Sequence, residues 1–314
     1  VISGIHPYKK IFPLSEQAGT TISMRWTALD FSDEIKAIIN LNKAGNRSEV
    51  ENALAGFAVP GQNFVWADIS GNIGYVCAAK IPVRKELSGI YIYDGTKAFS
   101  DWTGFVPYSE MPKSYNPAEN FLASANNRIS ENFPYHISNI WEPPSRINRI
   151  KSLLASKGKH GVSDFIKYQN DIYSDHAAEI CGYLFNAFDS VRTKTKKEQE
   201  VLYHLKKWDY TMDKGLQAPA VFSVFFGHLL KNTYQDEMGK NLFREFSFMA
   251  SIPIRSMSRL LAEKDTVWFD DIRTPAKETR NEILRKSFSD AVLFLEKEYG
   301  KEIAFWQWGN LHTI

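Results

Sequence analysis

The sequence changes its hydrophobic pattern near residue 146, and this change constrains the fold more than any other feature. Up to about residue 130, short runs that alternate apolar and polar residues are separated by Gly and Pro, which is typical of strands and turns. From Arg146 onward, apolar residues recur at helical spacing. The pattern therefore predicts an α+β chain, with a strand-rich part over residues 1–145 and a mainly helical lobe over residues 146–314.

A β-hairpin is the clearest element of the first part. The runs 63–68 and 72–78 are rich in apolar and aromatic residues, and they flank a turn in which Gly71 and Asn72 can adopt positive φ. Proline and aromatic residues crowd the stretch 82–120, which predicts a long structured loop region rather than a linker. Further strands are expected at 20–26 and 121–125, and short helices at 32–44 and 48–57.

Helices are predicted throughout the second part. The longest apolar run, residues 218–230, includes His228 and falls short of the ~18 apolar residues that a membrane-spanning helix needs. We therefore expect a buried helix there and no membrane span. The expected helices cover residues 146–156, 163–171, 176–192, 195–208, 217–235 and 277–299.

Charge and cysteine content exclude several classes of protein. The chain carries 38 basic and 36 acidic residues, a net charge of +2, so no strong basic field predicts binding to nucleic acid. The two cysteines, Cys77 and Cys181, are too few for a disulfide framework and are expected to be buried thiols. The residues after Val1 show no charged start followed by an apolar signal core, so we expect a fragment or a processed piece.

Common catalytic fingerprints are absent from the sequence, which has no G-x-S-x-G elbow, phosphate-binding loop, H-E-x-x-H motif or paired C-x-x-C. One segment stands out, because Asn126, Asn127 and Arg128 directly follow an apolar run. The amide of an asparagine held at such a point can donate a hydrogen bond to a developing oxyanion. The alternative, which the residues leave open, is a turn in which asparagine caps its own backbone.

A series of short segments stands in a recognisable order along the chain. They are 25–30 (RWTALD), 59–68 (VPGQNFVWAD), 71–75 (GNIGY), 102–104 (WTG), 115–117 (YNP), 123–128 (ASANNR), 143–147 (PPSRI) and 306–312 (WQWGNLH). Together these segments resemble the penicillin acylase family of N-terminal-nucleophile hydrolases. The resemblance is dense over about residues 20–155 and weak in the helical stretch before the closing motif.

The resemblance implies both a fold and a reaction. The strands would belong to a four-layer αββα core, and enzymes of this family cleave an amide bond with a Ser at the N-terminus of the large chain. The family's oxyanion-hole asparagine maps onto Asn126 and its active-site arginine onto Arg146, whose permanent charge would add positive potential. Gln62 would line the acyl-side pocket, and Asn63 and Trp141 would lie in the supporting shell.

The same resemblance implies where the attacking group lies. The free α-amino group of an N-terminal Ser, with a reference pKa of about 7.7–8.0, can accept the hydroxyl proton, which explains why no triad is visible. Val1 is not a nucleophile, so we expect a central fragment that supplies Asn126 and Arg146 and is inactive alone. The expected partners are the remaining segments of its precursor, namely the small chain and the N-terminal part of the large chain.

Further expectations concern ligands and location. The substrate would be a small N-acyl compound such as a β-lactam, an N-acyl amino acid or an acyl-homoserine lactone. No cofactor is required for the chemistry; family enzymes often carry a structural calcium, but its ligands cannot be matched to individual residues here, and no metal site is assigned. Relatives are mostly exported, so the resemblance implies a periplasmic or secreted protein.

A second class of function is a non-catalytic binding module for a sugar or a peptide. Aromatic residues make up 14% of the chain and are frequent between Tyr91 and Tyr115, and aromatic faces make good binding platforms. Asn126 and Arg146 would then be purely structural. The residues upstream of Val1 discriminate between the two, because a nucleophile behind a removable linker supports the hydrolase, whereas a signal peptide directly before Val1 supports the module.

Overall fold

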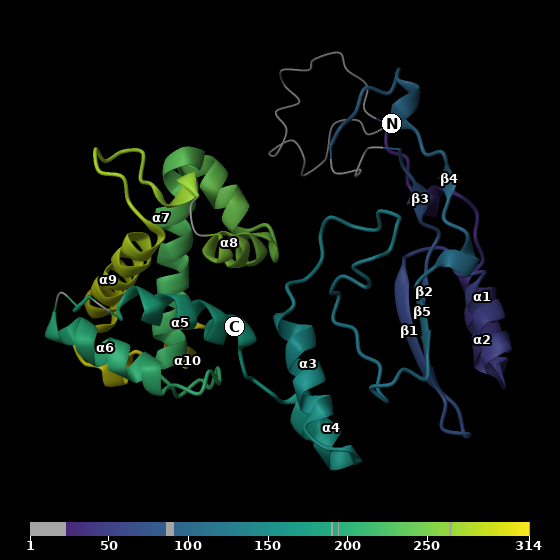
Figure 1. Cartoon of the computed structure of the whole chain (residues 1–314), viewed down its shortest axis with the longest axis horizontal. Coiled ribbons are helices and arrows are strands. Elements are labelled where there is room, and N and C mark those ends of the chain that lie inside the picture. The colour runs from purple at the N-terminus through teal and green to yellow at the C-terminus, as the bar shows by residue number, and fades with distance from the viewer. Residues whose placement is uncertain (1–22, 86–90, 190, 194, 264–265, 314) are drawn as a thin grey trace. The chain divides into compact units, whose positions relative to one another are not determined.

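The computed structural model describes residues 23–85, 91–189, 191–193, 195–263 and 266–313. Helices and strands both occur, so the predicted α+β class is confirmed. The chain divides into two compact units, Val1–Trp141 and Glu142–Ile314. The labelled strands all belong to the first unit, and the second consists of helices and loops (Figure 1).

The predicted hairpin forms the centre of the first unit. Strands β1 (Gln62–Ala67) and β2 (Ile73–Ala78) pair antiparallel, with Asn63 opposite Cys77 and Val65 opposite Tyr75. Strand β5 (Lys113–Tyr115) pairs antiparallel with the other side of β2, which gives the order β1-β2-β5. A separate two-stranded sheet joins β3 (Pro82–Val83) to β4 (Gly104–Phe105).

The hairpin turn is closed by one carboxylate. Asp68 Oδ1 accepts hydrogen bonds of 2.9 Å from the backbone N–H groups of Ser70 and Asn72, and its Oδ2 accepts one of 2.8 Å from the Asn72 amide. These bonds, led by the one from the Asn72 side chain, lower the pKa of Asp68. Gly71 has a φ of 84°, a left-handed conformation that glycine adopts without steric cost. The turn predicted from the sequence is therefore stabilised by the Asp68 carboxylate and by the positive φ of Gly71.

Two short helices pack on this sheet, as predicted. Helix α1 (Glu34–Lys43) begins after Asp33, whose side chain accepts from the Lys36 N–H, and α2 (Arg47–Leu54) begins after Asn46, which caps it in the same way. The first unit also contains the short 3-10 helices η3 (Thr27–Leu29), η4 (Ala98–Ser100) and η5 (Tyr108–Glu110). The buried residues that join the helices to β2 are Ala37, Val50, Leu54, Phe57, Val76 and Ala78.

Two strand predictions in this unit are wrong. Within the run 20–26, residues 20–22 lie outside the described residues, and 23–26 form no strand. The run 121–125 is apolar but pairs with no described strand, so it has no backbone ladder and stays irregular. A short apolar run predicts burial more reliably than it predicts pairing, because strand formation depends on a partner elsewhere in the chain.

The second unit is helical, as its periodicity predicts, and each of the six expected helices is present. The helix expected at 176–192 ends at Ala187, and the one expected at 217–235 continues to Ser247, whereas the other ends differ by three residues or fewer. They are α3 (Ser145–Ala155), α4 (Val162–Gln169), α5 (Asp175–Ala187), α6 (Lys196–Lys207), α7 (Ala218–Ser247) and α9 (Arg280–Tyr299). The structure adds α8 (Ile252–Ala262), η6 (Val267–Phe269), η7 (Ile303–Phe305) and α10 (Trp308–Leu311). Helix α7 contains a break at Gly239, whose φ of 69° is not helical.

One continuous core holds this unit together, built mainly from α5, α7 and α9. Helices α7 and α9 run along each other (Figure 1) and bury residues such as Phe225, Leu229 and Phe288. Trp306, from the closing motif, is fully buried in the same core, and its indole Nε1 donates a 2.8 Å hydrogen bond to the Gly300 carbonyl. The motif near the end of the chain is therefore a packing element of the helical unit.

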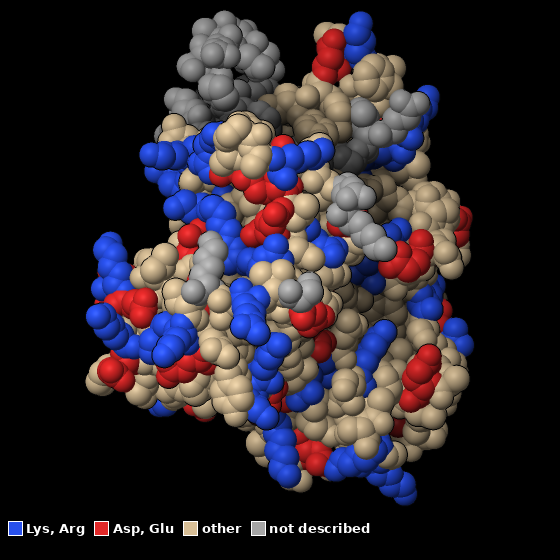
Figure 2. Space-filling model, turned by 60° about the vertical axis from the view of Figure 1, so that its left-hand side comes forward, with Lys and Arg blue, Asp and Glu red and all other residues tan. Residues whose placement is uncertain are grey.

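The surface carries charges of both signs. On the face drawn in Figure 2, Lys and Arg side chains lie interleaved with Asp and Glu, in keeping with the net charge of +2. Within the described part of the chain, no helix combines the length and the apolar character needed to cross a bilayer.

Candidate active-site residues

Asn126 occupies a tight, exposed turn in the first unit. Its φ of 59° lies in the left-handed region, which non-glycine residues rarely adopt and which asparagine tolerates better than most. The preceding residue, Ala125, is buried, whereas Asn126 itself is exposed. Backbone conformations of this kind persist where the surroundings hold them, and they gather at functional sites. The turn thus presents Asn126 from an anchored position.

The neighbouring residue, Asn127, caps the backbone of its own turn, which is the alternative that the sequence left open. Its Oδ1 accepts a 3.1 Å hydrogen bond from the Ala125 N–H, and its Nδ2 donates one of 2.8 Å to the Arg128 carbonyl. Asn127 thus uses its amide to close the turn that contains Asn126.

Asn63 joins this segment to the hairpin. Its Nδ2 donates a 3.1 Å hydrogen bond to the hydroxyl oxygen of Ser124, two residues before Asn126. Its Oδ1 accepts a 2.6 Å hydrogen bond from the Tyr75 hydroxyl. Burial raises the pKa of Tyr75, which keeps the phenol protonated and able to donate. The supporting residue expected from the sequence is thus bonded on both ends of its amide, between a strand and the turn.

Gln62 does not join this network. It begins β1 opposite Ala78 and is exposed. Successive side chains of a strand point to opposite faces, so Gln62 points away from the face that carries Asn63. The structure therefore brings Asn63, but not Gln62, to the segment of Asn126, and the pocket role of Gln62 stays a prediction.

The remaining two candidates flank the boundary between the units. Trp141 is partly buried at the end of the first unit, and Arg146 is exposed in the first turn of α3, in the second unit. A cation at a helix N-terminus gains nothing from the helix dipole, so the dipole does not account for an arginine there. Their roles in catalysis and support stay predictions.

Sequence reasoning missed Tyr75 and Ser124 as parts of this arrangement. The hairpin register could have identified Tyr75, because Asn63 pairs with Cys77 and Tyr75 is then its diagonal neighbour on the same face. Ser124 has no comparable signal, since the segment 121–125 was assigned to a strand that does not form.

The described residues contain no cluster of three or more His, Cys, Asp or Glu side chains arranged to hold a metal ion. The two cysteines are buried, as expected, and burial raises the pKa of both thiols, to about 12 for Cys181. Neither thiol is suited to act as a nucleophile, because the thiolate is the reactive form.

The aromatic stretch of the rival binding module is only partly engaged within the first unit: Tyr91 and Phe99 are exposed, whereas Trp102 is covered by its neighbours. Trp102 packs edge-on against Phe105. The guanidinium groups of Arg25 and Arg84 lie over its ring, 4.5 Å and 5.6 Å from the ring centroid. A stacking platform needs an open ring face, and these contacts cover much of Trp102.

Comparison with known families settles the relationship of the chain. The family model described as penicillin amidase matches residues 3–314. The chain belongs to the penicillin amidase family. The resemblance inferred from short motifs is thereby confirmed, including across the helical part where the motifs were weak.

Individual relatives point the same way. The chain is 28% identical over 311 residues to the acyl-homoserine lactone acylase QuiP of Pseudomonas fluorescens strain Pf0-1, covering 94% of this chain and 38% of that protein. It is 26% identical over 215 residues to the penicillin acylase 2 proenzyme of Pseudomonas sp. strain SE83, covering 68% and 27%. The chain thus spans well under half the length of these relatives.

A solved structure supports the fold. A thermostable penicillin G acylase from Alcaligenes faecalis matches with a TM-score of 0.72, at 20% sequence identity, over 87% of this chain and 54% of that chain. At this identity the likeness concerns the fold alone.

Proposed function

We propose that this chain is the central part of an N-acyl amide hydrolase and that it supplies the oxyanion donor of the active site. The observation that carries the proposal is the exposed left-handed turn of Asn126, joined to the hairpin through Ser124 and Asn63 in a chain of the penicillin amidase family. A donor that stabilises a transition state must be held in place before the reaction, and this anchoring provides that.

The chemistry follows from three groups. A Ser at the N-terminus of the large chain attacks the amide carbonyl, with its own α-amino group as the base. The Asn126 Nδ2–H donates to the oxygen that becomes negative in the tetrahedral intermediate. Arg146 adds positive potential near that charge. No residue of this chain maps onto the Ser, so its other segments, the small chain and the start of the large chain, are the proposed partners.

The substrate class rests on the relatives. Two of them are named for acting on acyl-homoserine lactones and penicillins, both of which carry an N-acyl amide. We place acyl-homoserine lactones first among the candidates, with β-lactams and N-acyl amino acids behind them. The polar side chain of Gln62 fits an acyl-side pocket that is not a purely apolar slot. An exported, periplasmic or secreted location is part of the same proposal.

An amine-release assay tests the proposal. The full-length protein is incubated with an N-acyl-homoserine lactone, penicillin G and an N-acyl amino acid, and the free amine is quantified. We expect release from at least one of the three, fastest from the lactone. The 314-residue chain alone is the control and should release none, because groups that act as a unit lose nearly all activity when one is missing. Absence of amine from the folded full-length protein with every substrate would contradict the proposal.

Asn63 is expected to act as a positioning residue. Replacing it with alanine removes both hydrogen bonds of its amide, to Ser124 and from Tyr75, and frees the turn that carries Asn126. We expect kcat to fall by about tenfold to a hundredfold, since small displacements of a catalytic group have effects of this size. KM should change little.

The control for Asn63 is Asn72→Ala, which removes a hairpin-turn amide on the same sheet, away from Ser124. It should leave kcat near the wild-type value even though it weakens the turn. If both variants lower kcat equally, Asn63 acts through the stability of the hairpin and not through the turn of Asn126.

A further inference from the structure

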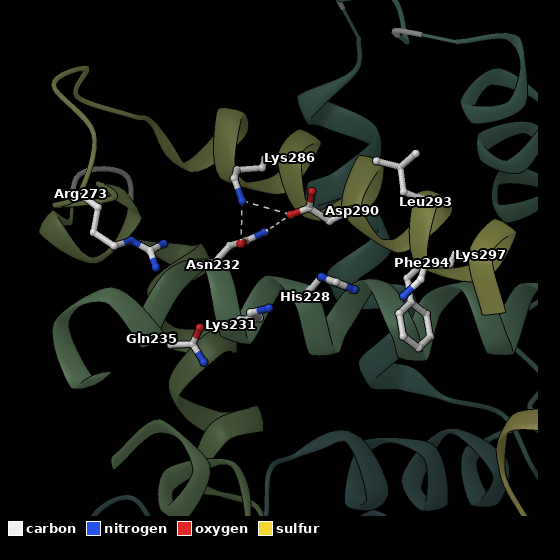
Figure 3. Close-up of a pocket in the computed structure, with 10 residues that line it drawn as sticks. All are labelled: His228, Lys231, Asn232, Gln235, Arg273, Lys286, Asp290, Leu293, Phe294 and Lys297. Carbon is white, nitrogen blue, oxygen red and sulfur yellow. Dashed lines mark hydrogen bonds and ion pairs between the residues drawn. The ribbon is translucent and has the colours of Figure 1, made fainter. Parts of the chain in front are cut away.

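A second, unassigned cleft lies within the helical unit, between α7 and α9. Its volume is about 500 Å³, within the range of small-molecule sites. Residues spaced by a helical turn on each helix face it, so the cleft is built from two rigid elements (Figure 3). The lining residues are His228, Lys231, Asn232, Gln235, Arg273, Lys286, Asp290, Leu293, Phe294 and Lys297.

A buried amide organises the centre of the cleft. Asn232 is only 7% exposed, and its Nδ2 donates to Ser287 Oγ at 3.0 Å and to Asp290 Oδ2 at 2.9 Å. Its Oδ1 accepts a 2.8 Å hydrogen bond from Lys286 Nζ, which also donates to Asp290 at 3.1 Å. Figure 3 shows Lys286 reaching from α9 toward Asn232 on α7. The ammonium group is therefore held in a fixed position.

The lining offers more donors than acceptors. It contains four cations and a single carboxylate, that of Asp290. Arg273 uses Nε and Nη2 on Asp271, at 2.7 Å each, which leaves the N–H groups of Nη1. Lys231 forms no ion pair with any carboxylate in the described part of the chain. Such a site is complementary to a group that only accepts hydrogen bonds and carries negative charge.

One end of the cleft is apolar. Leu293 is 63% exposed and Phe294 is 40% exposed, which is high for side chains of their size. The rings of His228 and Phe294 pack edge-on, with their centroids 5.9 Å apart. Desolvation lowers the pKa of His228, so its imidazole is neutral near pH 7. Leu293 and Phe294 lie on α9, which also carries Lys286 and Lys297, whereas Lys231 lies on α7 and Arg273 lies in the loop before α9 (Figure 3).

We propose that this cleft binds a small amphiphilic anion, whose carboxylate or phosphate head contacts Lys231, Lys286 and Arg273 and whose apolar part packs on Leu293 and Phe294. The shared chemistry is an oxyanion joined to a short hydrocarbon chain. The site goes beyond the amide hydrolysis proposed above, and its chemistry does not depend on that activity.

Calorimetric titration of the full-length protein with octanoate, octyl phosphate and octanamide tests the proposal. Octanoate and octyl phosphate separate the two head groups, and octanamide has the same chain without charge. We expect saturable binding of at least one anion, with octanamide at least about tenfold weaker, because a charged hydrogen bond contributes that much to affinity. Binding of neither anion, or equal binding of octanamide, would overturn the proposal.

The variant Lys231→Gln locates the site. Lys231 is exposed and makes no described ion pair, so its replacement should not disturb folding. Affinity for the bound anion should fall by about tenfold. Lys240→Gln is the matched control, since Lys240 is an exposed lysine of the same helix outside the cleft, and it should leave the affinity unchanged. Equal affinities of Lys231→Gln and wild type would mean that the anion binds elsewhere, for instance at the hydrolytic site.

Discussion

Replacing Asn126 with alanine in the full-length protein is expected to lower kcat for amide hydrolysis by about 10²–10³-fold. An oxyanion donor acts only in the transition state, so its removal reduces kcat and kcat/KM together and leaves substrate binding almost unchanged. Asn126→Asp should be at least as severe, because an ionised carboxylate accepts hydrogen bonds but cannot donate one. Steady-state rates of amine release, with circular dichroism to verify folding, provide the measurement.

The matched control is Asn120→Ala. Asn120 also has a left-handed backbone, with a φ of 61°, and its amide makes only a local 3.2 Å hydrogen bond to the Ala118 carbonyl. Alanine is strained to the same extent at either position, because both have a positive φ. We expect Asn120→Ala to retain wild-type kcat. A similar loss in both variants would assign the effect of Asn126 to backbone strain instead of oxyanion stabilisation.

The largest expected effect on stability comes from Trp306→Ala. Trp306 is fully buried in the core of the helical unit and donates to the Gly300 carbonyl. Truncating a buried tryptophan leaves a cavity and costs about 3–5 kcal/mol. The free energy of unfolding of this unit should fall by that amount, measured by urea denaturation of the full-length protein.

A neighbouring aromatic residue serves as the control for Trp306. Phe305 is 62% exposed, so Phe305→Ala should change the urea midpoint little, because substitutions at exposed positions usually cost about 0.5 kcal/mol or less. Trp306→Phe keeps most of the ring volume but leaves the Gly300 carbonyl without its donor, and it should fall between the two. Equal midpoints for the alanine variants at 305 and 306 would contradict the packing role of the closing motif.

Local signals predicted most of the fold. The hairpin followed from the turn chemistry of residues 68–72, and the helices followed from apolar spacing. Helix α8 was not predicted; Pro253 lies in its first turn, where proline's missing N–H costs nothing. The false strand at 121–125 has a different cause: its residues are partly or fully buried, but pairing needs a second strand that no local pattern specifies.

For the candidate site, the sequence supplied residues but not their arrangement. The position of Asn126 after an apolar run singled it out, and the family resemblance supplied the role proposed for it. The turn-closing role of Asn127 could not be foreseen, since it depends on hydrogen bonds within one turn. The α7–α9 cleft was also hidden, because His228 and Asp290 belong to helices whose relative rotation is set by packing of the whole core.

Product analysis in water enriched in the heavy isotope of oxygen tests the central claim most directly. An N-acyl-homoserine lactone contains both an amide and a lactone, and mass spectrometry of the products tells which bond the full-length protein cleaves. Amide hydrolysis, which we predict, gives a labelled fatty acid and unlabelled homoserine lactone with its ring closed. Labelled N-acyl-homoserine with an intact amide would contradict the account, because the bond cleaved would then be the lactone ester and not the amide.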